Sequence, residues 1–536
     1  MTPYDPESLR LAQGAVAALS RGDRAGAQSM ARQLLLGRPH DPNANLVLGA
    51  LALEAGDLAA ARRHLERAAQ AAPNQGHIVN TLGVALRRSG ELDGARKNFA
   101  RAGELGLIDG WRNLGNLEEL EHNADASIAA YRRALQLAPE DAASHGALAQ
   151  AYERRHDLER ARTHAERALK SDPRNENARL ALAQVRLRQK DYAGAIAAAE
   201  PLALSAGASL TNRSLAWGVI GDARDRLDDA AGAFAAFTAG NRMLLEQNQA
   251  LLNATHLIYH PAGLERMRAL AAAADVRAWR APPAGETPVF LVGFPRSGTT
   301  LLDQVLSSHS RIVCIEEREH FANALGGVIN DAEKLANLGA LSEGEIETVR
   351  ADYWRRVRAE TTVPDGALVV DKLPLNIVVL PLIRRIFPEA KAIFALRDPR
   401  DVVLSCFQQR FGMNAAMAQF LDLGAAAAYY DSVMRLMDIC RERLALSLHQ
   451  VRYEDVVADL EAQARALTAF LDLPFEPAML RYRETALQRD INTPSARQVV
   501  QPLYTRSVAR WRRYENELAP VLPLLTPWAV RFGYEP

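Results

Sequence analysis

The stretch 288-PVFLVGFPRSGTTLL-302 contains the turn around which the second half of the chain is built. An apolar run at 289–292 leads into Gly293, and Gly298 follows directly before a second apolar segment. This is the spacing of a phosphate-binding loop, G-x-x-x-x-G-K-[ST], except that Thr299 occupies the lysine position. Two glycines let consecutive backbone N–H groups point at an anion at a helix N-terminus. The stretch therefore predicts a strand, an anion-binding loop and a helix.

The other side chains of this loop also suit an anion. Ser297, Thr299 and Thr300 carry hydroxyl groups that can donate hydrogen bonds. Arg296 offers a planar fork of N–H groups that fits a phosphate or a sulfate. We predict that these four residues and Gly298 hold the anionic part of a ligand.

The missing lysine argues against a nucleotide triphosphatase. In those enzymes the lysine reaches the terminal phosphates, and an acidic residue after a second strand helps to hold Mg²⁺. Asp371 is placed like that acid, but Lys372 follows it and would compete with a metal ion. An anion transferred without a metal is therefore expected, and an ATP- and Mg²⁺-dependent P-loop kinase is the alternative.

Short apolar runs alternate with helical patterns after residue 289, which predicts a three-layer α/β domain with a parallel, P-loop-like sheet. Ligands of such sheets bind beyond the carboxyl ends of the strands. Polar pairs stand at those ends, at Glu316–Glu317, Asp371–Lys372 and Arg397–Asp398. The runs lie at 289–292, 312–315, 367–370, 392–396 and 447–453.

The pair 293-GFPRSGTTLL-302 and 395-ALRDPRDVVLS-405 resembles the paired signature of the sulfotransferases that use 3′-phosphoadenosine 5′-phosphosulfate (PAPS). In that family the first loop holds the 5′-phosphosulfate. An arginine and a serine of the second segment hold the 3′-phosphate, and the matching positions are Arg397 and Ser405. The resemblance covers roughly residues 286–515 and is closest to the tyrosylprotein sulfotransferases.

The resemblance to tyrosylprotein sulfotransferases implies further roles. Glu317 matches the family's catalytic base, and Lys372 matches a lysine that contacts the sulfate-bearing region. A serine and a lysine that close over the donor match Ser495 and Arg510, the latter with arginine in place of lysine. Two further positions depart from the family: a second 3′-phosphate arginine falls at Gln409, beside Arg410, and Glu319 replaces an arginine.

The chemistry of sulfuryl transfer supports these roles independently. An in-line transfer needs positioned reactants and cations that neutralise the charge developing on the leaving phosphate. Arg296, Lys372 and the loop amides can supply that charge. An acceptor hydroxyl benefits from a base, for which Glu317 is the candidate and Glu316 the rival.

The first half of the chain repeats itself. Acidic residues open similar segments at intervals of 34 residues, as at Asp23, Asp57 and Glu91, and again at Asp157 and Asp191. This pattern resembles the tetratricopeptide repeat, with about seven helix pairs over residues 5–250. Such an α solenoid presents a groove for peptides or protein partners. A solenoid that only forms a homodimer or spaces the second domain is the alternative.

Composition limits the remaining choices. Lys+Arg and Asp+Glu both number 64 in 536 residues, so the charge does not suggest nucleic acid or an anionic membrane. Neither a secretory signal nor a run of 18 apolar residues is found, and the three cysteines form no metal-ligand pattern. We expect a cytoplasmic protein without a metal site. Its domains are placed at 5–250 (solenoid), 251–285 (connecting helix and linker) and 286–536 (sulfotransferase domain).

The predicted function is transfer of a sulfuryl group from PAPS to an acceptor hydroxyl by in-line displacement. The solenoid favours a peptide or protein acceptor, with tyrosine as one candidate, while a glycan or a small molecule stays open. A repeat scaffold whose second domain binds nucleotide without catalysis is a further alternative. The joint presence of Arg296, Glu317, Lys372, Arg397 and Ser405 disfavours it.

Overall fold

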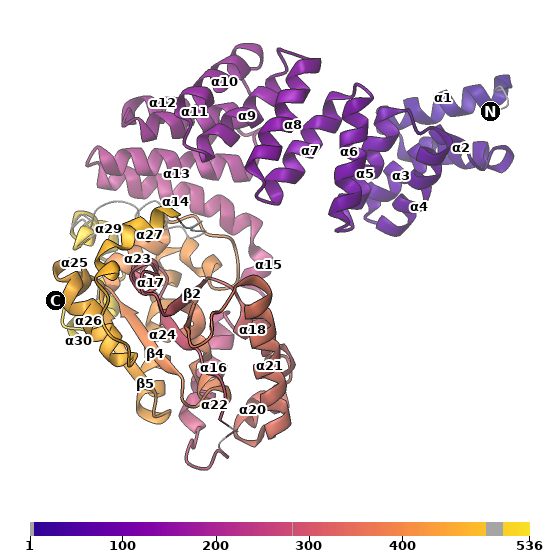
Figure 1. Cartoon of the computed structure of the whole chain (residues 1–536). Helices are drawn as coiled ribbons and strands as arrows, with labels where there is room; N and C mark the ends of the chain where they lie inside the picture. The colour runs from indigo at the N-terminus through magenta and orange to yellow at the C-terminus, as the bar shows by residue number, and fades with distance from the viewer. Residues whose placement is uncertain (1–4, 281, 283, 489–507) are drawn as a thin grey trace. The chain divides into compact units, whose positions relative to one another are not determined.

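The computed structural model describes residues 5–280, 282, 284–488 and 508–536. Its contacts divide the chain into two compact units, Met1–Ala223 and Arg224–Pro536. The first unit is helical, and the second is built on a sheet (Figure 1). No helix in the described part of the chain is long and apolar enough to cross a membrane.

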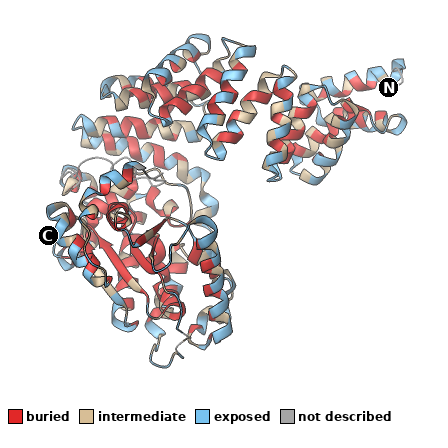
Figure 2. Ribbon diagram, in the orientation of Figure 1, coloured by how far each residue is buried: buried red, intermediate tan, exposed pale blue. Residues whose placement is uncertain are grey.

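The first unit is a series of helix pairs, which confirms the predicted solenoid of tetratricopeptide-like repeats. In each pair the two helices are joined by a short turn, and their buried faces meet (Figure 2). A further helix, α13 (Leu210–Arg226), follows and ends in the second unit. The pairs are α1 (Pro6–Ser20) with α2 (Arg24–Gly37), α3 (Pro42–Ala55) with α4 (Leu58–Ala71), α5 (Gly76–Arg88) with α6 (Leu92–Glu104), α7 (Ile108–Leu120) with α8 (Ala124–Leu137), α9 (Ala142–Arg154) with α10 (Leu158–Ser171), and α11 (Glu176–Arg188) with α12 (Tyr192–Ala203).

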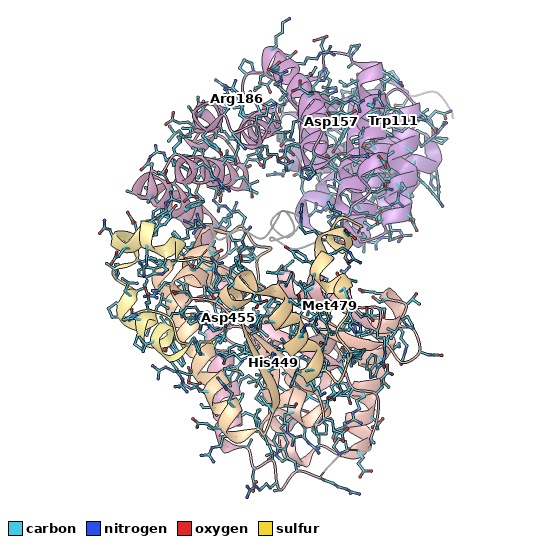
Figure 3. All side chains as sticks on the ribbon, turned by 60° about the vertical axis from the view of Figure 1, so that its left-hand side comes forward. Trp111, Asp157, Arg186, His449, Asp455 and Met479 are labelled. Carbon is cyan, nitrogen blue, oxygen red and sulfur yellow. The ribbon has the colours of Figure 1, made fainter. Side chains whose placement is uncertain are left out.

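The recurring acidic residues stand at the start of the second helix in five of the six pairs, and Asn123 takes that position before α8. Each is the N-cap of its helix, a position at which a side-chain oxygen can satisfy a backbone N–H that lacks a partner within the helix. The Glu91 side chain makes no such hydrogen bond. Asp157, for example, caps α10 (Figure 3). Four of them accept a hydrogen bond from the N–H three residues on, at 2.9–3.2 Å: Asp23, Asp57, Asp157 and Asp191.

The second unit contains a five-stranded parallel sheet, as predicted. Its strand order is β2-β3-β1-β4-β5, so the strand before the glycine loop lies at the centre. The loop and the carboxyl ends of β2, β3 and β4 therefore lie at the same end of the sheet. The strands are β1 (Val289–Gly293), β2 (Ile312–Glu316), β3 (Leu368–Lys372), β4 (Lys391–Leu396) and β5 (Ser447–Arg452).

Helices cover both faces of this sheet, which confirms the three-layer α/β class. Alternate residues of β1 face opposite cores: Phe290 and Val292 on one side, Val289 and Leu291 on the other. The first core includes residues of α16 (Pro261–Ala273), α21 (Glu343–Glu360), α22 (Leu380–Ile386), α23 (Pro399–Gln408), α24 (Leu423–Arg443) and α30 (Leu522–Arg531), and the second includes α17 (Thr299–Ser307) and α26 (Leu460–Phe470).

The packing divides the chain earlier than the boundaries that the sequence suggests at 250 and 286. Helix α14 (Ala230–Gln247) contributes Phe237 to the buried cluster that contains Phe290. Asn241 of the same helix donates a hydrogen bond to the backbone oxygen of Phe407 at 2.9 Å. Residues 224–250 therefore continue the helical pattern of the repeats but pack with the sheet unit. The functional extent of each domain stays a prediction.

Candidate active site

The loop between β1 and α17 has the backbone shape that an anion-binding turn requires. Arg296 and Gly298 both have left-handed backbone angles, with φ of 71° and 92°. A Cβ at Gly298 would also lie 2.8 Å from the Tyr453 ring, so glycine is required there on two counts. Helix α17 then starts at Thr299 with Gly298 as its N-cap, so its first N–H groups open onto the loop.

The two signature segments meet across neighbouring strands β1 and β4. Arg296 Nε donates a hydrogen bond to Ser405 Oγ at 3.0 Å, and Arg397 Nη1 donates to the backbone oxygen of Arg296 at 3.3 Å. The Arg397 guanidinium also lies over the Tyr453 ring, 5.2 Å from its centroid, and the residue is only 8% exposed. Three residues predicted for the donor site are thus brought into one cluster.

A buried lysine joins the candidate base to the sheet. Lys372 Nζ lies 3.0 Å from Glu317 Oε1 and 3.6 Å from Glu316 Oε1, and the lysine side chain is fully buried. Glu317 also donates its backbone N–H to the Lys372 carbonyl at 2.8 Å. Its φ of 45° is left-handed, a conformation that costs a non-glycine residue energy and occurs often at functional sites.

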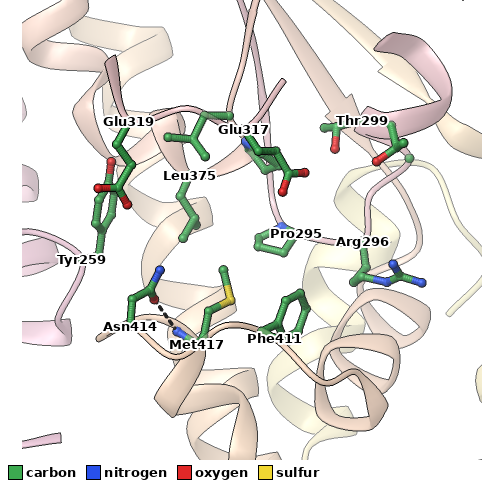
Figure 4. A pocket seen from close by; sticks show the side chains of 14 residues that line it. Tyr259, Pro295, Arg296, Thr299, Glu317, Glu319, Leu375, Phe411, Asn414 and Met417 are labelled. Atoms are coloured by element: carbon green, nitrogen blue, oxygen red, sulfur yellow. Dashed lines mark hydrogen bonds between the residues drawn. The ribbon is translucent and has the colours of Figure 1, made fainter. Parts of the chain in front are cut away.

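A pocket at the carboxyl ends of the strands is lined by both the loop and the candidate base (Figure 4). Of the predicted site residues, Arg296, Gly298, Thr299, Thr300 and Glu317 line it. Its walls are largely apolar between the loop and the far end, where Glu319 stands. The remaining lining residues are Tyr259, Pro295, Leu373, Pro374, Leu375, Phe411, Asn414 and Met417.

Several pocket residues carry no signal in the sequence that would assign them to a site. Tyr259 comes from the segment before α16, far from the loop in sequence, and falls within the predicted linker. Phe411, Asn414 and Met417 follow α23 in a stretch without a recognisable motif. The neighbouring Arg410 is the one candidate that the sequence offers there.

The other predicted donor residues lie outside this pocket. Ser297, Lys372, Arg397 and Ser405 are buried or half-buried and do not belong to its lining. Arg410 Nη1 donates to Asn241 Oδ1 at 3.4 Å. Arg510 forms an ion pair with Asp225 at 3.1 Å. Ser495 lies outside the described residues.

Asp371, the residue placed like a metal-binding acid, is engaged elsewhere. Tyr353 Oη donates to one of its oxygens at 3.1 Å and Asn376 Nδ2 to the other at 3.2 Å. Burial raises the pKa of this carboxyl from 3.8 to about 7, although both hydrogen bonds oppose the rise. With both oxygens occupied inside the core, Asp371 is not oriented to hold a metal ion at the loop.

This raised pKa predicts a pH-dependent stability. The folded protein keeps a proton on Asp371 between pH 3.8 and about 7, whereas the unfolded chain releases it, so the free energy of unfolding falls as the pH rises through that window. Asp371→Asn cannot ionise, so it should remove this fall in the free energy of unfolding, which amounts to up to roughly 4 kcal/mol. Urea unfolding of both proteins at pH 5 and pH 8 tests it. If the two proteins differ in free energy of unfolding by the same amount at pH 5 and at pH 8, the raised pKa of Asp371 is contradicted.

Comparison with known proteins places this site in context. Residues 288–477 match the sulfotransferase family. Residues 147–209, and 18–75 with 52–105, match tetratricopeptide repeats. The chain therefore joins a repeat region to a sulfotransferase-family domain, in agreement with the resemblance found in its motifs.

Three relatives are similar over less than half of the chain. An uncharacterized protein of Aquifex aeolicus is 30% identical over 44% of this chain, and the match spans only 32% of that protein's length. Protein-tyrosine sulfotransferase A of Caenorhabditis elegans is 25% identical over 46% of this chain and 67% of its own length. Protein-tyrosine sulfotransferase 1 of Danio rerio is 25% identical over 46% of this chain and 72% of its own.

Proposed function

Because this chain joins tetratricopeptide repeats to a sulfotransferase-family domain, we propose that it transfers a sulfuryl group from PAPS to an acceptor hydroxyl. The acceptor is proposed to be a tyrosine of a peptide or protein that the repeats help to hold. Two relatives named protein-tyrosine sulfotransferase support the tyrosine acceptor. A cytoplasmic location stays a prediction.

The observation that carries this proposal is the contact between the two signature segments. The hydrogen bond from Arg296 to Ser405 places the glycine loop beside α23. A donor with phosphate groups at both its 5′ and 3′ positions needs two anion sites on one face. The loop amides with Arg296 would hold the 5′ side, and Arg397 with Ser405 the 3′ side.

The second part of the proposal concerns the acceptor. Glu317 stands in the pocket between the loop and the apolar walls, so its carboxylate would take the proton from an acceptor hydroxyl placed there. Lys372 touches that carboxylate and would add positive charge near the transferred group. Arg296 would neutralise charge on the departing phosphate. We propose a transfer that needs no metal ion.

The kinase alternative has less support. Thr299 replaces the lysine that a P-loop kinase needs, and the two oxygens of Asp371 are already hydrogen-bonded in the core. No observation on the described residues favours it over sulfuryl transfer.

Replacement of Arg397 tests the donor assignment. We expect Arg397→Ala to weaken the binding of 3′,5′-adenosine diphosphate (PAP, the spent donor) by roughly 10- to 100-fold, because a charge-assisted hydrogen bond to phosphate is lost. Isothermal titration calorimetry measures the change in both proteins. ATP with Mg²⁺, titrated in parallel, should bind the wild type more weakly than PAP.

A matched control is Arg435→Ala. Arg435 is an exposed arginine of α24 that pairs with Asp431 at 2.7 Å, so its loss should leave PAP binding unchanged. Preference of the wild type for ATP with Mg²⁺ would refute the proposed donor. Undiminished PAP binding by Arg397→Ala would refute the role of that arginine.

A further inference from the structure

The pocket extends beyond the candidate base. Arg296 and Thr299 stand at one end and Glu317 stands between the ends (Figure 4). Glu319 and Tyr259 form the other end, beyond the candidate base. An acceptor bound along this pocket with its hydroxyl at Glu317 would therefore place further atoms beside the wall towards Glu319.

The carboxylate of Glu319 has no cation of its own. It is exposed, and within the described residues it forms neither an ion pair nor a side-chain hydrogen bond. The nearby cations are committed elsewhere. Arg318 pairs with Glu360 at 3.3 Å, and Lys372 pairs with Glu317 at 3.0 Å. The far end of the pocket therefore carries uncompensated negative charge.

The hydroxyl of Tyr259 adds a second unsatisfied group at the same place. Its oxygen is buried and has no hydrogen-bond partner among the described residues. The backbone around it is fixed, because Tyr429 Oη donates to the Tyr259 carbonyl at 2.9 Å. Burial, followed by the charges of Glu319 and Asp371, raises the pKa of Tyr259, so the hydroxyl stays neutral. A buried polar atom without a partner is costly, which suggests that a ligand supplies one.

The wall between Glu317 and this end is largely apolar. Leu375 and Met417 lie between Glu317 and Glu319, and Pro295 and Phe411 lie across the pocket from Glu317, on the side of Arg296 (Figure 4). Aromatic and apolar side chains of this kind pack against a ring by dispersion and burial. A phenol ring placed between Glu317 and Glu319 would bury apolar surface against these side chains.

We propose that the acceptor is a tyrosine flanked by lysine or arginine, whose cationic group is received by the Glu319 carboxylate and the Tyr259 hydroxyl oxygen. This inference rests on the proposed sulfuryl transfer and adds the sequence context of the acceptor. A carboxylate oxygen and a hydroxyl oxygen both accept hydrogen bonds from an ammonium or guanidinium group. A tyrosine flanked by acidic residues would instead meet Glu319 as a like charge.

Three blocked peptides, each with one central tyrosine, test this preference. Their two flanking residues are lysine, glutamine or glutamate, and acetylated and amidated ends leave the flanks as the only difference in charge. Binding is measured by calorimetry on the full chain saturated with PAP, and turnover with labelled PAPS. We expect the lysine peptide to bind about tenfold more tightly than the glutamate peptide, with the glutamine peptide between them.

Substitutions of Glu319 and Tyr259 test whether this end of the pocket causes the preference. Glu319→Arg should reverse the preference, and Glu319→Gln should abolish it. Tyr259→Phe should weaken the lysine peptide about 2- to 5-fold and leave the glutamate peptide unchanged, because the lost hydroxyl oxygen accepts a hydrogen bond that an ionised glutamate cannot donate. Glu333→Arg reverses the charge of an exposed residue on α20 (Ala332–Ala336), outside the pocket. It should leave the peptide preference unchanged.

The outcomes separate this inference from the proposed function. Failure of PAP to bind would overturn both. PAP binding with equal binding of the three peptides, or an unchanged preference in Glu319→Arg, would overturn the inference alone. PAP binding without binding of any of the three peptides would overturn the inference and the proposed tyrosine acceptor, but not the proposed donor. PAP binding of each variant, compared with wild type, shows whether the fold survives the substitution.

Discussion

Replacement of Glu317 by alanine should lower the turnover of sulfuryl transfer by roughly 10²- to 10⁴-fold, the usual contribution of a positioned general base. Among the described residues, the variant loses the only carboxylate that both lines the middle of the pocket and touches Lys372. Donor binding should be little affected, because the proposed donor contacts come from the loop and from Arg397. Steady-state kinetics with a tyrosine peptide, together with PAP calorimetry, measure the two effects separately.

The neighbouring glutamate provides the matched control. Glu316 lies 3.6 Å from Lys372 Nζ but does not line the pocket, so Glu316→Ala should lower turnover by less than about tenfold. A large loss in Glu316→Ala with normal activity in Glu317→Ala would exchange the two roles. The pH dependence gives a second readout, since removal of a true base should abolish the acidic limb of the rate profile.

Periodicity in the sequence predicted the architecture, because each repeat and each strand follows a local rule. An aspartate recurs at the start of the second helix in most pairs because it caps that helix, and Asp57 and Asp191 both accept from the N–H three residues on. The strand pattern needed only buried apolar runs and the parallel-sheet rule. The sequence alone does not show with which unit residues 224–250 pack. The segment around Phe237 has a helical pattern that would look the same in either unit, although Phe237 belongs to the core of the sheet unit.

The site was predictable only where its chemistry is encoded by neighbouring residues. The glycine loop and the segment at 395–405 are each contiguous, so their residue types and spacing are enough to indicate an anion site. The rest of the pocket lining is not contiguous in the sequence. Tyr259 and Met417 come from segments far apart in sequence and meet only through packing. Likewise, nothing local reveals that Asp371 points into the core towards Tyr353.

Replacement of Lys372 should have the second large effect, on turnover and on stability together. Lys372→Met keeps the length of the side chain but removes a fully buried ammonium group that faces two carboxylates. Breaking a buried ion pair by removal of one partner typically costs about 3–5 kcal/mol. Turnover should fall by roughly 10²- to 10³-fold, because charge that stabilises the transition state is lost as well.

A double-mutant cycle separates the two contributions of Lys372. If the lysine acts only by positioning Glu317, the Glu317→Ala/Lys372→Met protein should be no slower than Glu317→Ala, and its stability should exceed that of Lys372→Met because one unpaired carboxylate is gone. If Lys372 also neutralises the transferred group, the double variant should be slower than either single variant. We expect the second result, since the ammonium lies within reach of the base at 3.0 Å and ends the strand beside the glycine loop. Equal turnover of Lys372→Met and wild type would refute both roles and leave the lysine as a structural counter-ion for two strand-end glutamates.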